Sequence, residues 1–526
     1  MGFGRWARAA LPVAVLTFAT TAGAQTGGPV TLKTEDGFTR LRGEILEFDG
    51  QTYTLRTPLG VLDIDAMQVE CEGEACPENP LFGSDFGVVG SNTIGTGLLP
   101  TLIQGYADML DAELVREYGA EDTESVFRIL HDDGREMAAI RLDAEGSGAS
   151  FDALAQGRAA LGLSSRRARD ADVQMLSEAG YDDPRDTGTE HVVALDGLVA
   201  ITHPANPVRS ISIGDLARVF SGEISDWAQL GGPRTPIKVF ARNDGSGTLD
   251  TFETLVMTPA GASLTPLAER FDSDLELSDA VASDAAAIGF TTLASTRASK
   301  PLGVRQSCGL LSLPTTFAIK TEEYPLSRRL YVYESPEEKP AHARRLLDFA
   351  LSSDAQPLIQ EAGFIDSAPE TAALDEMGGR IVYSLTTEDE FSLPAMREML
   401  SELQNAERLS TTFRFTPGSS QLDPLSQREA NSLAQNLANG DFDGKQVLLV
   451  GFTDAIGEFD LNQQLGNRRA GVVLEALRQA AGGALGRVEI ATRGYGELMP
   501  VGCNETFGGR LANRRVEVWV RDVPQT

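Results

Sequence analysis

Residues 86–97 read FGVVGSNTIGTG and lead directly into an apolar, helix-like stretch that extends to Leu110. A short run of Phe and Val before a glycine-rich turn and a helix is typical of a strand, loop and helix in an α/β domain. The same order recurs at residues 237–252, where IKVF precedes a polar loop and a second helical pattern. We therefore expect an α/β domain over residues 84–370.

A different pattern precedes this region. Residues 28–77 alternate polar and apolar positions, and Asp36-Gly37 and Asp49-Gly50 interrupt the alternation. Asp-Gly between alternating runs is a strong hairpin signal. The pattern predicts a small all-β domain that serves as an adaptor or packing module.

Two further segments follow the α/β region. Residues 371–409 predict a connector whose amphipathic helix extends from Pro394 to Leu409. Residues 410–524 predict an α+β domain with the order βαβαββ. In that domain Asp423-Pro424 is a helix N-cap followed by proline at the first helical position, and residues 447–450 form a buried strand.

The amino-acid composition argues against several classes of binding partner and cofactor. The 526 residues include 45 Lys and Arg against 76 Asp and Glu, a net charge of −31. Such acidity argues against nucleic acid and anionic lipid as partners, since both require a basic surface. The four His residues show no metal-ligand spacing, so neither a metal site nor another cofactor is expected.

The amino terminus has the features of an export signal. Arg5 and Arg8 precede an apolar run at 9–19, and Ala22-Gly23-Ala24 is a small-x-small cleavage site. The alternative, a transmembrane anchor, requires about 20 apolar residues. We expect a signal peptide at 1–24, a mature chain that begins near Gln25, no transmembrane span, and a periplasmic location at the cell wall or outer membrane.

In an exported protein the four cysteines are candidates for disulfide bonds, because disulfides persist in oxidising compartments. Cys71 and Cys76 enclose four residues, which suits a local bridge, and Cys308 and Cys503 remain. We hypothesise the pairs Cys71–Cys76 and Cys308–Cys503, the second joining two domains. Two isolated thiols at Cys308 and Cys503 are the alternative.

Three loops rich in Gly, Ser and Thr lie where predicted strands meet helices. They are residues 90–97, 146–150 and 242–248. Amide groups at a helix start, the positive end of the helix dipole and added hydroxyl groups suit a tetrahedral oxyanion. Arg242 adds a planar guanidinium that binds two oxygens at once. A single loop of this kind is usually only a turn, but three in one domain favour an anion site.

This set resembles the periplasmic phosphate-binding receptors of ABC transporters, which have a type II periplasmic-binding fold with two lobes around a cleft. Similar text includes residues 157–166, 208–230 and 287–290. The resemblance implies phosphate or a similar oxyanion as ligand and an ABC permease as a candidate partner. The anion-binding residues it implies or places in the cleft are Thr93, Ile94, Ser147, Ser165, Arg166, Arg242, Ser246, Gly247 and Thr248.

One departure concerns selectivity. Receptors of this family place an Asp in the cleft that accepts the proton of hydrogen phosphate, and this chain has Ser164-Ser165-Arg166-Arg167 at that stretch. An unpaired buried acceptor is how such a site rejects sulfate. The sequence therefore predicts oxyanion binding without strict phosphate selectivity.

The C-terminal segment carries a second motif. Residues 453–470 fit the pattern T-D-x-x-G-x-x-x-x-N-x-x-L-x-x-x-R-A, and NRRVE follows at 513–517. This is similar to the OmpA-type domain that binds peptidoglycan, with Phe452 and Gly466 as departures where His and Ser are frequent. The resemblance implies Thr453, Asp454, Asn462 and Arg469 as peptidoglycan-binding residues. Asp454 would take the ammonium and Arg469 the carboxylate of diaminopimelate; a structural Asp–Arg ion pair is the alternative.

These features together predict a non-enzymatic periplasmic receptor that captures an oxyanion and is anchored to peptidoglycan. The alternative is a wall-linked structural or sensory protein whose binding lobe does not serve transport. No Walker loop, H-E-x-x-H or G-x-S-x-G motif is found. We expect no catalytic residues, and a catalytic role ranks third.

Overall fold

The computed structural model describes residues 29–523 except 35–38, 49–51, 67–68, 74, 78–81, 122, 187, 245, 337–338, 388–391, 417–418, 420, 483–484 and 486–487. The chain forms two compact units, residues 1–82 and 83–526. The predicted signal peptide and both Asp-Gly turns lie outside the described residues. In the part of the chain that is described, no helix is both long and apolar enough to cross a membrane.

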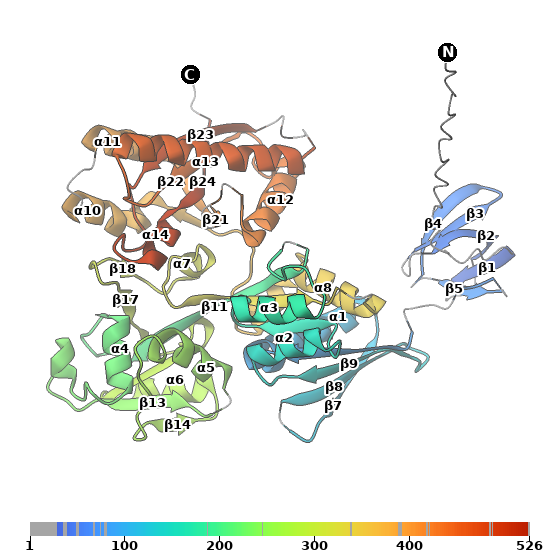
Figure 1. Ribbon diagram of the computed structural model, residues 1–526, viewed down its shortest axis with the longest axis horizontal. Coiled ribbons are helices and arrows are strands. Elements are labelled where there is room, and N and C mark those ends of the chain that lie inside the picture. The colour runs from blue at the N-terminus through green and yellow to red at the C-terminus, as the bar shows by residue number, and fades with distance from the viewer. Residues whose placement is uncertain are drawn as a thin grey trace, which may run out of the picture. The chain divides into compact units, whose positions relative to one another are not determined.

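The first unit is an antiparallel sheet of five strands in the order β4-β3-β2-β1-β5 (Figure 1). Alternate residues face its core, and Val30, Leu32, Tyr53 and Leu55 are almost fully buried. A disulfide joins Cys71, in β5, to Cys76. The strands are β1 (Pro29–Thr34), β2 (Arg40–Phe48), β3 (Thr52–Thr57), β4 (Gly60–Asp65) and β5 (Val69–Glu72).

The second unit begins with two α/β lobes that share one sheet of eleven strands. Nine of its strands lie in one lobe or the other. The long strands β11 (Glu190–Thr202) and β19 (Ser327–Glu334) pair with each other in the middle of the sheet and pass from lobe to lobe. This is the two-lobed fold that the resemblance implied.

The first lobe contains β6 (Ser84–Gly90), η1 (Thr93–Leu98), α1 (Leu99–Met109), β7 (Glu113–Tyr118), β8 (Glu124–Leu130), β9 (Glu136–Asp143), α2 (Ser147–Ala155), β10 (Leu161–Ser164), α3 (Asp170–Glu178), α8 (Ala341–Leu351) and α9 (Gln356–Glu361). Its helices α1, α2 and α3 lie close to the sheet that carries β9 (Figure 1). Helix α2 packs on β10 and β6, so the start of this helix lies near the ends of these two strands.

The second lobe contains β12 (Ser210–Ile211), α4 (Ile213–Phe220), η2 (Trp227–Leu230), β13 (Lys238–Arg242), α5 (Gly247–Phe252), η3 (Glu253–Met257), β14 (Glu269–Phe271), α6 (Asp274–Ser283), β15 (Ala287–Thr292), η4 (Leu293–Ser295), β16 (Lys300–Pro301), β17 (Gly303–Arg305), β18 (Leu311–Ser312) and α7 (Thr316–Lys320). Its core includes Trp227 and Phe220, and the rings of Phe252 and Phe290 stack at 4.1 Å. The helical pattern predicted at the end of residues 237–252 is α5.

The C-terminal part consists of β20 (Thr371–Ala373), η5 (Leu374–Met377), α10 (Gly378–Thr387), α11 (Leu393–Leu403), β21 (Glu407–Arg414), α12 (Pro424–Asn439), β22 (Lys445–Phe452), α13 (Phe459–Ala480), β23 (Glu489–Gly496), α14 (Phe507–Asn513) and β24 (Arg515–Asp522). Its sheet has the order β20-β21-β24-β22-β23. Asp423 caps α12 by accepting the Ser426 N–H at 2.8 Å, as predicted.

Two details differ from the sequence prediction. The amphipathic helix ends at Leu403 rather than Leu409, because residues from Glu407 onward pair as β21 with β24. A short helix, α14, lies between β23 and β24, where the predicted order had two consecutive strands.

The C-terminal part packs against the two-lobed part through the segment around α7. Phe317 of α7 is part of the C-terminal hydrophobic core, together with Met396, Met399 and Trp519. The next loop inserts Glu323, which is 5% exposed, into a cluster of buried arginines.

That arginine cluster is made of C-terminal residues. Arg408 donates to Glu323 at 2.6 Å, and the Arg515 guanidinium lies 2.7 Å from Glu517. Arg380 contacts Glu323 as well. A second bridge, Cys308–Cys503, joins the second lobe to the C-terminal part, so both hypothesised disulfides are present.

Candidate functional site

The first predicted loop begins at the end of β6. Gly90 has φ +141°, and a Cβ there would lie 2.0 Å from the carbonyl oxygen of Leu163, so only glycine fits this turn. Thr93 then begins η1, which continues into α1. The Ile94 side chain is 1% exposed and belongs to the lobe's core, so its backbone amide is the group that could serve a ligand.

The second loop starts α2 at Ser147. Its N-cap, Gly146, has no side chain, so no side-chain cap occupies the first-turn amides. The Ser147 hydroxyl accepts the Ser165 N–H at 2.9 Å and lies 3.4 Å from the Ser165 hydroxyl, which also contacts Ser91. Three serines from three segments therefore gather at the start of one helix.

The third loop joins β13 to α5. Arg242 ends β13, and its guanidinium lies 2.8 Å from the Asp274 carboxylate at the start of α6. Thr248 donates to the other oxygen of Asp274 at 2.9 Å. Ser246 is the N-cap of α5 and accepts from the Leu249 N–H. Asp274 thus holds two of the predicted ligand groups in place.

The first and third loops meet across the interlobe cleft. A Cβ on Gly247 would lie 2.8 Å from the Thr93 Cα and 2.9 Å from its nitrogen, so glycine permits this approach. Arg328 of β19 donates to the Thr93 hydroxyl at 2.9 Å and lies 3.4 Å from the Gly247 carbonyl oxygen. Its guanidinium also pairs with Asp196 at 3.1 Å. Arg328 therefore connects both lobes at their point of contact.

The predicted residues are divided between two cavities. A cavity of about 410 Å³ is lined by Thr93, Arg242, Ser246, Gly247 and Thr248. A second cavity of about 650 Å³ is lined by Ser147, Ser165 and Arg166. Of the nine predicted anion-binding residues, five line the smaller cavity and three line the larger one. Ile94 lines neither cavity.

The larger cavity is rich in arginine. Arg167, Arg169, Arg328 and Arg329 line it in addition to Arg166. Arg166 also lies 2.6 Å from Asp172 and above the Phe151 ring. Burial raises the pKa of Asp172, but the hydrogen bond and charge of Arg166 outweigh this, so the pKa is lowered overall. Arg169 is exposed and has no ion pair among the described residues.

Sequence reasoning missed Arg169, Arg328 and Arg329. Arg328 and Arg329 directly precede the buried strand segment Leu330–Tyr333. Two consecutive arginines at the start of an apolar strand were the sequence signal that could have identified them. Amides, hydroxyls and guanidinium groups in both cavities are donors of the kind that a tetrahedral anion accepts.

The second candidate site lies in the C-terminal part. Asp454 follows β22, accepts the Ile456 N–H at 3.0 Å and contacts the Arg514 guanidinium. Arg469 of α13 lies above the Phe415 ring at 5.5 Å. Among the described residues, its Nη1 and the Thr453 hydroxyl are buried polar atoms without a hydrogen-bond partner. Two donors are therefore left for a ligand.

The charges at this site do not form the alternative of an Asp454–Arg469 ion pair. Asp454 is paired with Arg514 instead. Burial is the main cause that lowers the pKa of Arg469; the charge of Arg514 lowers it further, and Asp454 opposes both. A carboxylate between two guanidinium groups leaves a net positive charge, which suits the carboxylate end of a zwitterion.

Asn462 has a different environment. Its side-chain amide donates to Glu497 at 3.2 Å, and both residues are buried, so Asn462 braces α13 rather than facing solvent. Gly466 is explained by packing, because a Cβ there would lie 2.4 Å from the Gly451 carbonyl oxygen.

Potential metal ligands occur near the second disulfide. Cys308, Cys503 and Glu505 bring ligand atoms within 4.8 Å of one another. Both sulfur atoms belong to the disulfide, so neither is the thiolate that binds a metal.

Comparison with known proteins places two families in this chain. The model of the PBP superfamily domain matches residues 118–354, and the model of the OmpA family matches residues 414–514. The phosphate-binding protein PstS of Borreliella burgdorferi is 24% identical over 231 residues, which cover 43% of this chain and 79% of that protein. The Escherichia coli protein YfiB is 36% identical over 110 residues, or 21% of this chain and 66% of that protein.

A solved structure of an ABC-type phosphate transport receptor from Vibrio cholerae aligns with 53% of this chain and 99% of its own length, at 23% identity and a TM-score of 0.41. The family assignment rests on the sequence matches. The chain therefore contains a PBP-like domain, matched over residues 118–354, and a C-terminal OmpA domain, matched over residues 414–514.

Proposed function

We propose that this protein is a non-enzymatic receptor that binds phosphate or a related oxyanion between its two lobes and is held on peptidoglycan by its OmpA-family domain. One observation carries the first half. In a chain of net charge −31, five of the predicted anion-binding residues, drawn from both lobes, line a single cavity: Thr93, Arg242, Ser246, Gly247 and Thr248. The Arg242 guanidinium and the hydroxyls of Thr93, Ser246 and Thr248 are donors that a tetrahedral anion accepts.

The donors suffice for useful affinity. Micromolar binding corresponds to about 8 kcal/mol, and a hydrogen bond to a charged group contributes roughly 1.5–3 kcal/mol. A handful of such bonds from Arg242, Ser246 and Thr248, which line the same cavity, with backbone amides, reaches this value after the cost of ordering.

Selectivity follows from the carboxylate in the smaller cavity. The stretch at residues 164–167 has no Asp, but Asp274 lines the cavity with Arg242 and Thr248. Hydrogen phosphate can donate its proton to this acceptor, whereas sulfate cannot. We expect phosphate to bind more tightly than sulfate, and Asp274→Asn to reduce that difference.

Isothermal titration of residues 25–526 with phosphate, arsenate and sulfate tests the receptor function. Phosphate and arsenate should bind in the micromolar range, with sulfate weaker. Failure of all three anions to bind would refute the receptor function.

The second half of the proposal concerns the wall. The unpartnered Nη1 of Arg469 and the Thr453 hydroxyl support binding of the diaminopimelate carboxylate, and the Asp454 carboxylate supports binding of its ammonium. The full chain should sediment with purified sacculi, and Arg469→Ala should remain in the supernatant. Arg478→Ala, on the same helix, is the matched control and should sediment like the parent protein. An Arg469→Ala variant that still sediments would contradict the assignment.

Location follows from the same proposal. The charged and apolar pattern of residues 1–24 supports cleavage of a signal peptide and export to the periplasm. Amino-terminal sequencing of the protein recovered from the periplasm should begin near Gln25, and a chain that retains Met1 would contradict this.

One observation favours wall-bound retention or sensing over transport. The receptor lobe is joined to the wall-binding domain by the Cys308–Cys503 disulfide and by the buried Glu323 cluster as well as by the chain itself. A receptor fixed in this way cannot diffuse to a permease. Growth on limiting phosphate should therefore be unaffected by loss of this protein; a growth defect would favour the transport role.

A further inference from the structure

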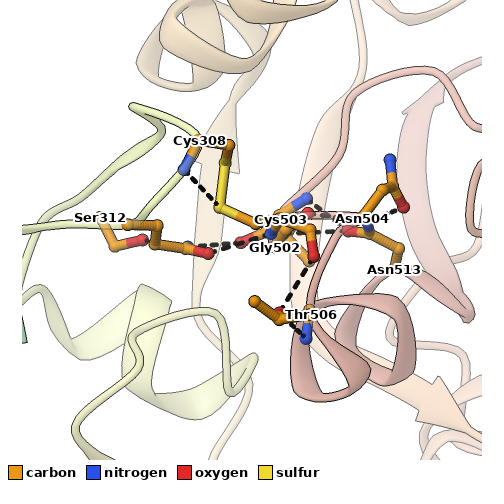
Figure 2. The surroundings of a disulfide bond; sticks show 10 residues. Cys308, Ser312, Gly502, Cys503, Asn504, Thr506 and Asn513 are labelled. Atoms are coloured by element: carbon orange, nitrogen blue, oxygen red, sulfur yellow. Dashed lines mark hydrogen bonds between the residues drawn. A yellow bond between two sulfur atoms is a disulfide. The ribbon is translucent and has the colours of Figure 1, made fainter.

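The loop Val501–Asn504 follows β23, and its residues Gly502, Cys503 and Asn504 lie between Cys308 of the second receptor lobe and Asn513 of α14 (Figure 2). It is part of the OmpA-family domain, and Val501 and Cys503 are almost fully buried. Residues from both domains hold this loop, so its conformation depends on more than the OmpA-family domain.

The receptor side holds the loop by one side chain and one covalent bond. The Gln306 amide donates to the Val501 carbonyl oxygen at 3.0 Å and accepts the Cys503 N–H at 3.1 Å. Cys308 forms the disulfide with Cys503. Gln306 thereby satisfies one backbone carbonyl oxygen and one backbone N–H of the loop.

The other side of the loop reaches the wall site. The Asn504 side-chain oxygen accepts the N–H of Ala455, the residue after Asp454, at 3.2 Å. Asn513 accepts the N–H groups of Val501 and Gly502 at 2.8 and 2.9 Å and donates to Asn504 at 2.8 Å. The next residue, Arg514, contacts Asp454.

Close packing leaves the loop little freedom where it meets α14. A Cβ on Gly502 would lie 2.6 Å from the Gly509 Cα, and a Cβ on Gly509 would lie 2.1 Å from the Cys503 carbonyl oxygen. A shift of the loop on the receptor side is therefore passed on to α14 and to the Asn513-Arg514 pair.

We propose that Gln306 and Cys308, both in the second receptor lobe, are positioning residues for the wall-peptide site of the OmpA-family domain. They fix the loop Val501–Asn504 so that Asn504 and Arg514 hold the Asp454 segment ready for ligand. A site ordered before binding avoids the cost of ordering it during binding. This inference rests on the proposed wall-binding function.

The test is titration of the mature full chain with a soluble diaminopimelate-containing muropeptide. Gln306→Ala and the double variant Cys308→Ser/Cys503→Ser should each bind about tenfold more weakly than the parent protein, which is about 1.4 kcal/mol. Gln174→Ala, an exposed glutamine in the first lobe, and Cys71→Ser/Cys76→Ser, which removes the other bridge, are matched controls with parental affinity.

A second readout separates positioning from general damage. Gln306 lines neither cleft cavity, so Gln306→Ala should keep parental affinity for phosphate. Reducing the parent protein should weaken muropeptide binding, and reoxidation should restore it. Full muropeptide affinity in Gln306→Ala and in the Cys308→Ser/Cys503→Ser variant would overturn the positioning role. No muropeptide binding by the parent protein would instead overturn the wall-binding function.

Discussion

Replacing Glu323 by glutamine removes a receptor-derived carboxylate from a buried cluster of OmpA-domain arginines. Arg408 donates to Glu323 at 2.6 Å, and Arg380 contacts it. Arg515 is 3.9 Å away. With glutamine at this position, three buried guanidinium groups share one remaining carboxylate, Glu517.

Two lines of reasoning give the size of the effect. Removing one partner of a buried ion pair costs roughly 3–5 kcal/mol, because a charge remains without compensation. Burial raises the pKa of Glu323, but Arg380, Arg408 and Arg515 together lower it from 4.5 to about 2. A shift of this size corresponds to roughly 3 kcal/mol. The two values agree, so we expect the free energy of unfolding to fall by about 3–4 kcal/mol near neutral pH.

The pH dependence has a definite sign. A carboxyl group whose pKa is lowered in the folded state stabilises the fold above its unfolded pKa of about 4.5. That contribution disappears as the pH falls from about 4.5 toward 2. The difference between the parent protein and Glu323→Gln should therefore shrink across this range.

Tryptophan fluorescence during urea unfolding is the assay. Residues 25–526 contain Trp227 in the second lobe and Trp519 in the OmpA-family domain, where the Trp519 indole donates to Glu517 at 3.0 Å. Trp227→Phe and Trp519→Phe backgrounds report the two regions separately. Glu361→Gln, an exposed substitution in α9, is the control. A loss below about 1 kcal/mol in Glu323→Gln at the Trp519 probe would refute the reasoning.

Three further substitutions follow from the same contacts. Glu429 of α12 lines a cavity between the two domains, and burial is the main cause that raises its pKa to about 8. The parent protein therefore loses stability as the pH rises from about 4.5 to 8, so Glu429→Gln should be more stable than the parent at about pH 9 and equal to it at about pH 4. A pH-independent difference in urea unfolding would contradict this. Gly247→Ala should weaken phosphate binding about tenfold in calorimetry, because the added Cβ would meet Thr93. Gly148→Ala, whose Cβ would have nothing within 4 Å, should not weaken it. Equal affinities in the two variants would show that the contact between Gly247 and Thr93 does not matter for phosphate binding. Arg242→Ala should weaken phosphate binding at least about tenfold and the exposed Arg234→Ala should not; an unchanged affinity in Arg242→Ala would place the anion elsewhere.

The elements that local sequence encodes were predictable. Apolar runs followed by Gly, Ser and Thr located all three strand-to-helix loops, because glycine and hydroxyl residues are favoured where a helix begins. Asp423-Pro424 marked the start of α12 for the same reason. Helix α14 was missed since its sequence begins with Gly508-Gly509 after Phe507, which carries little helical preference; Thr506 caps it and tertiary packing holds it.

The contacts that tertiary packing creates were not predictable. Asp454 pairs with Arg514, 60 residues later in the chain, and no spacing rule distinguishes that arginine from Arg469. Arg328 reaches the point where the lobes meet because β19 crosses between them, which depends on the sheet order. The insertion of Glu323 among arginines of another domain is likewise invisible until the domains are placed together.

The central claim joins an anion site to a wall site in one molecule, and one measurement tests both. Purified sacculi are incubated with the mature chain and radiolabelled phosphate and then sedimented. We predict that the parent protein carries phosphate into the pellet, that Arg242→Ala sediments without phosphate, and that Arg469→Ala leaves both protein and phosphate in the supernatant. Protein that sediments without phosphate in the parent, or phosphate retention that Arg242→Ala does not change, would contradict the account.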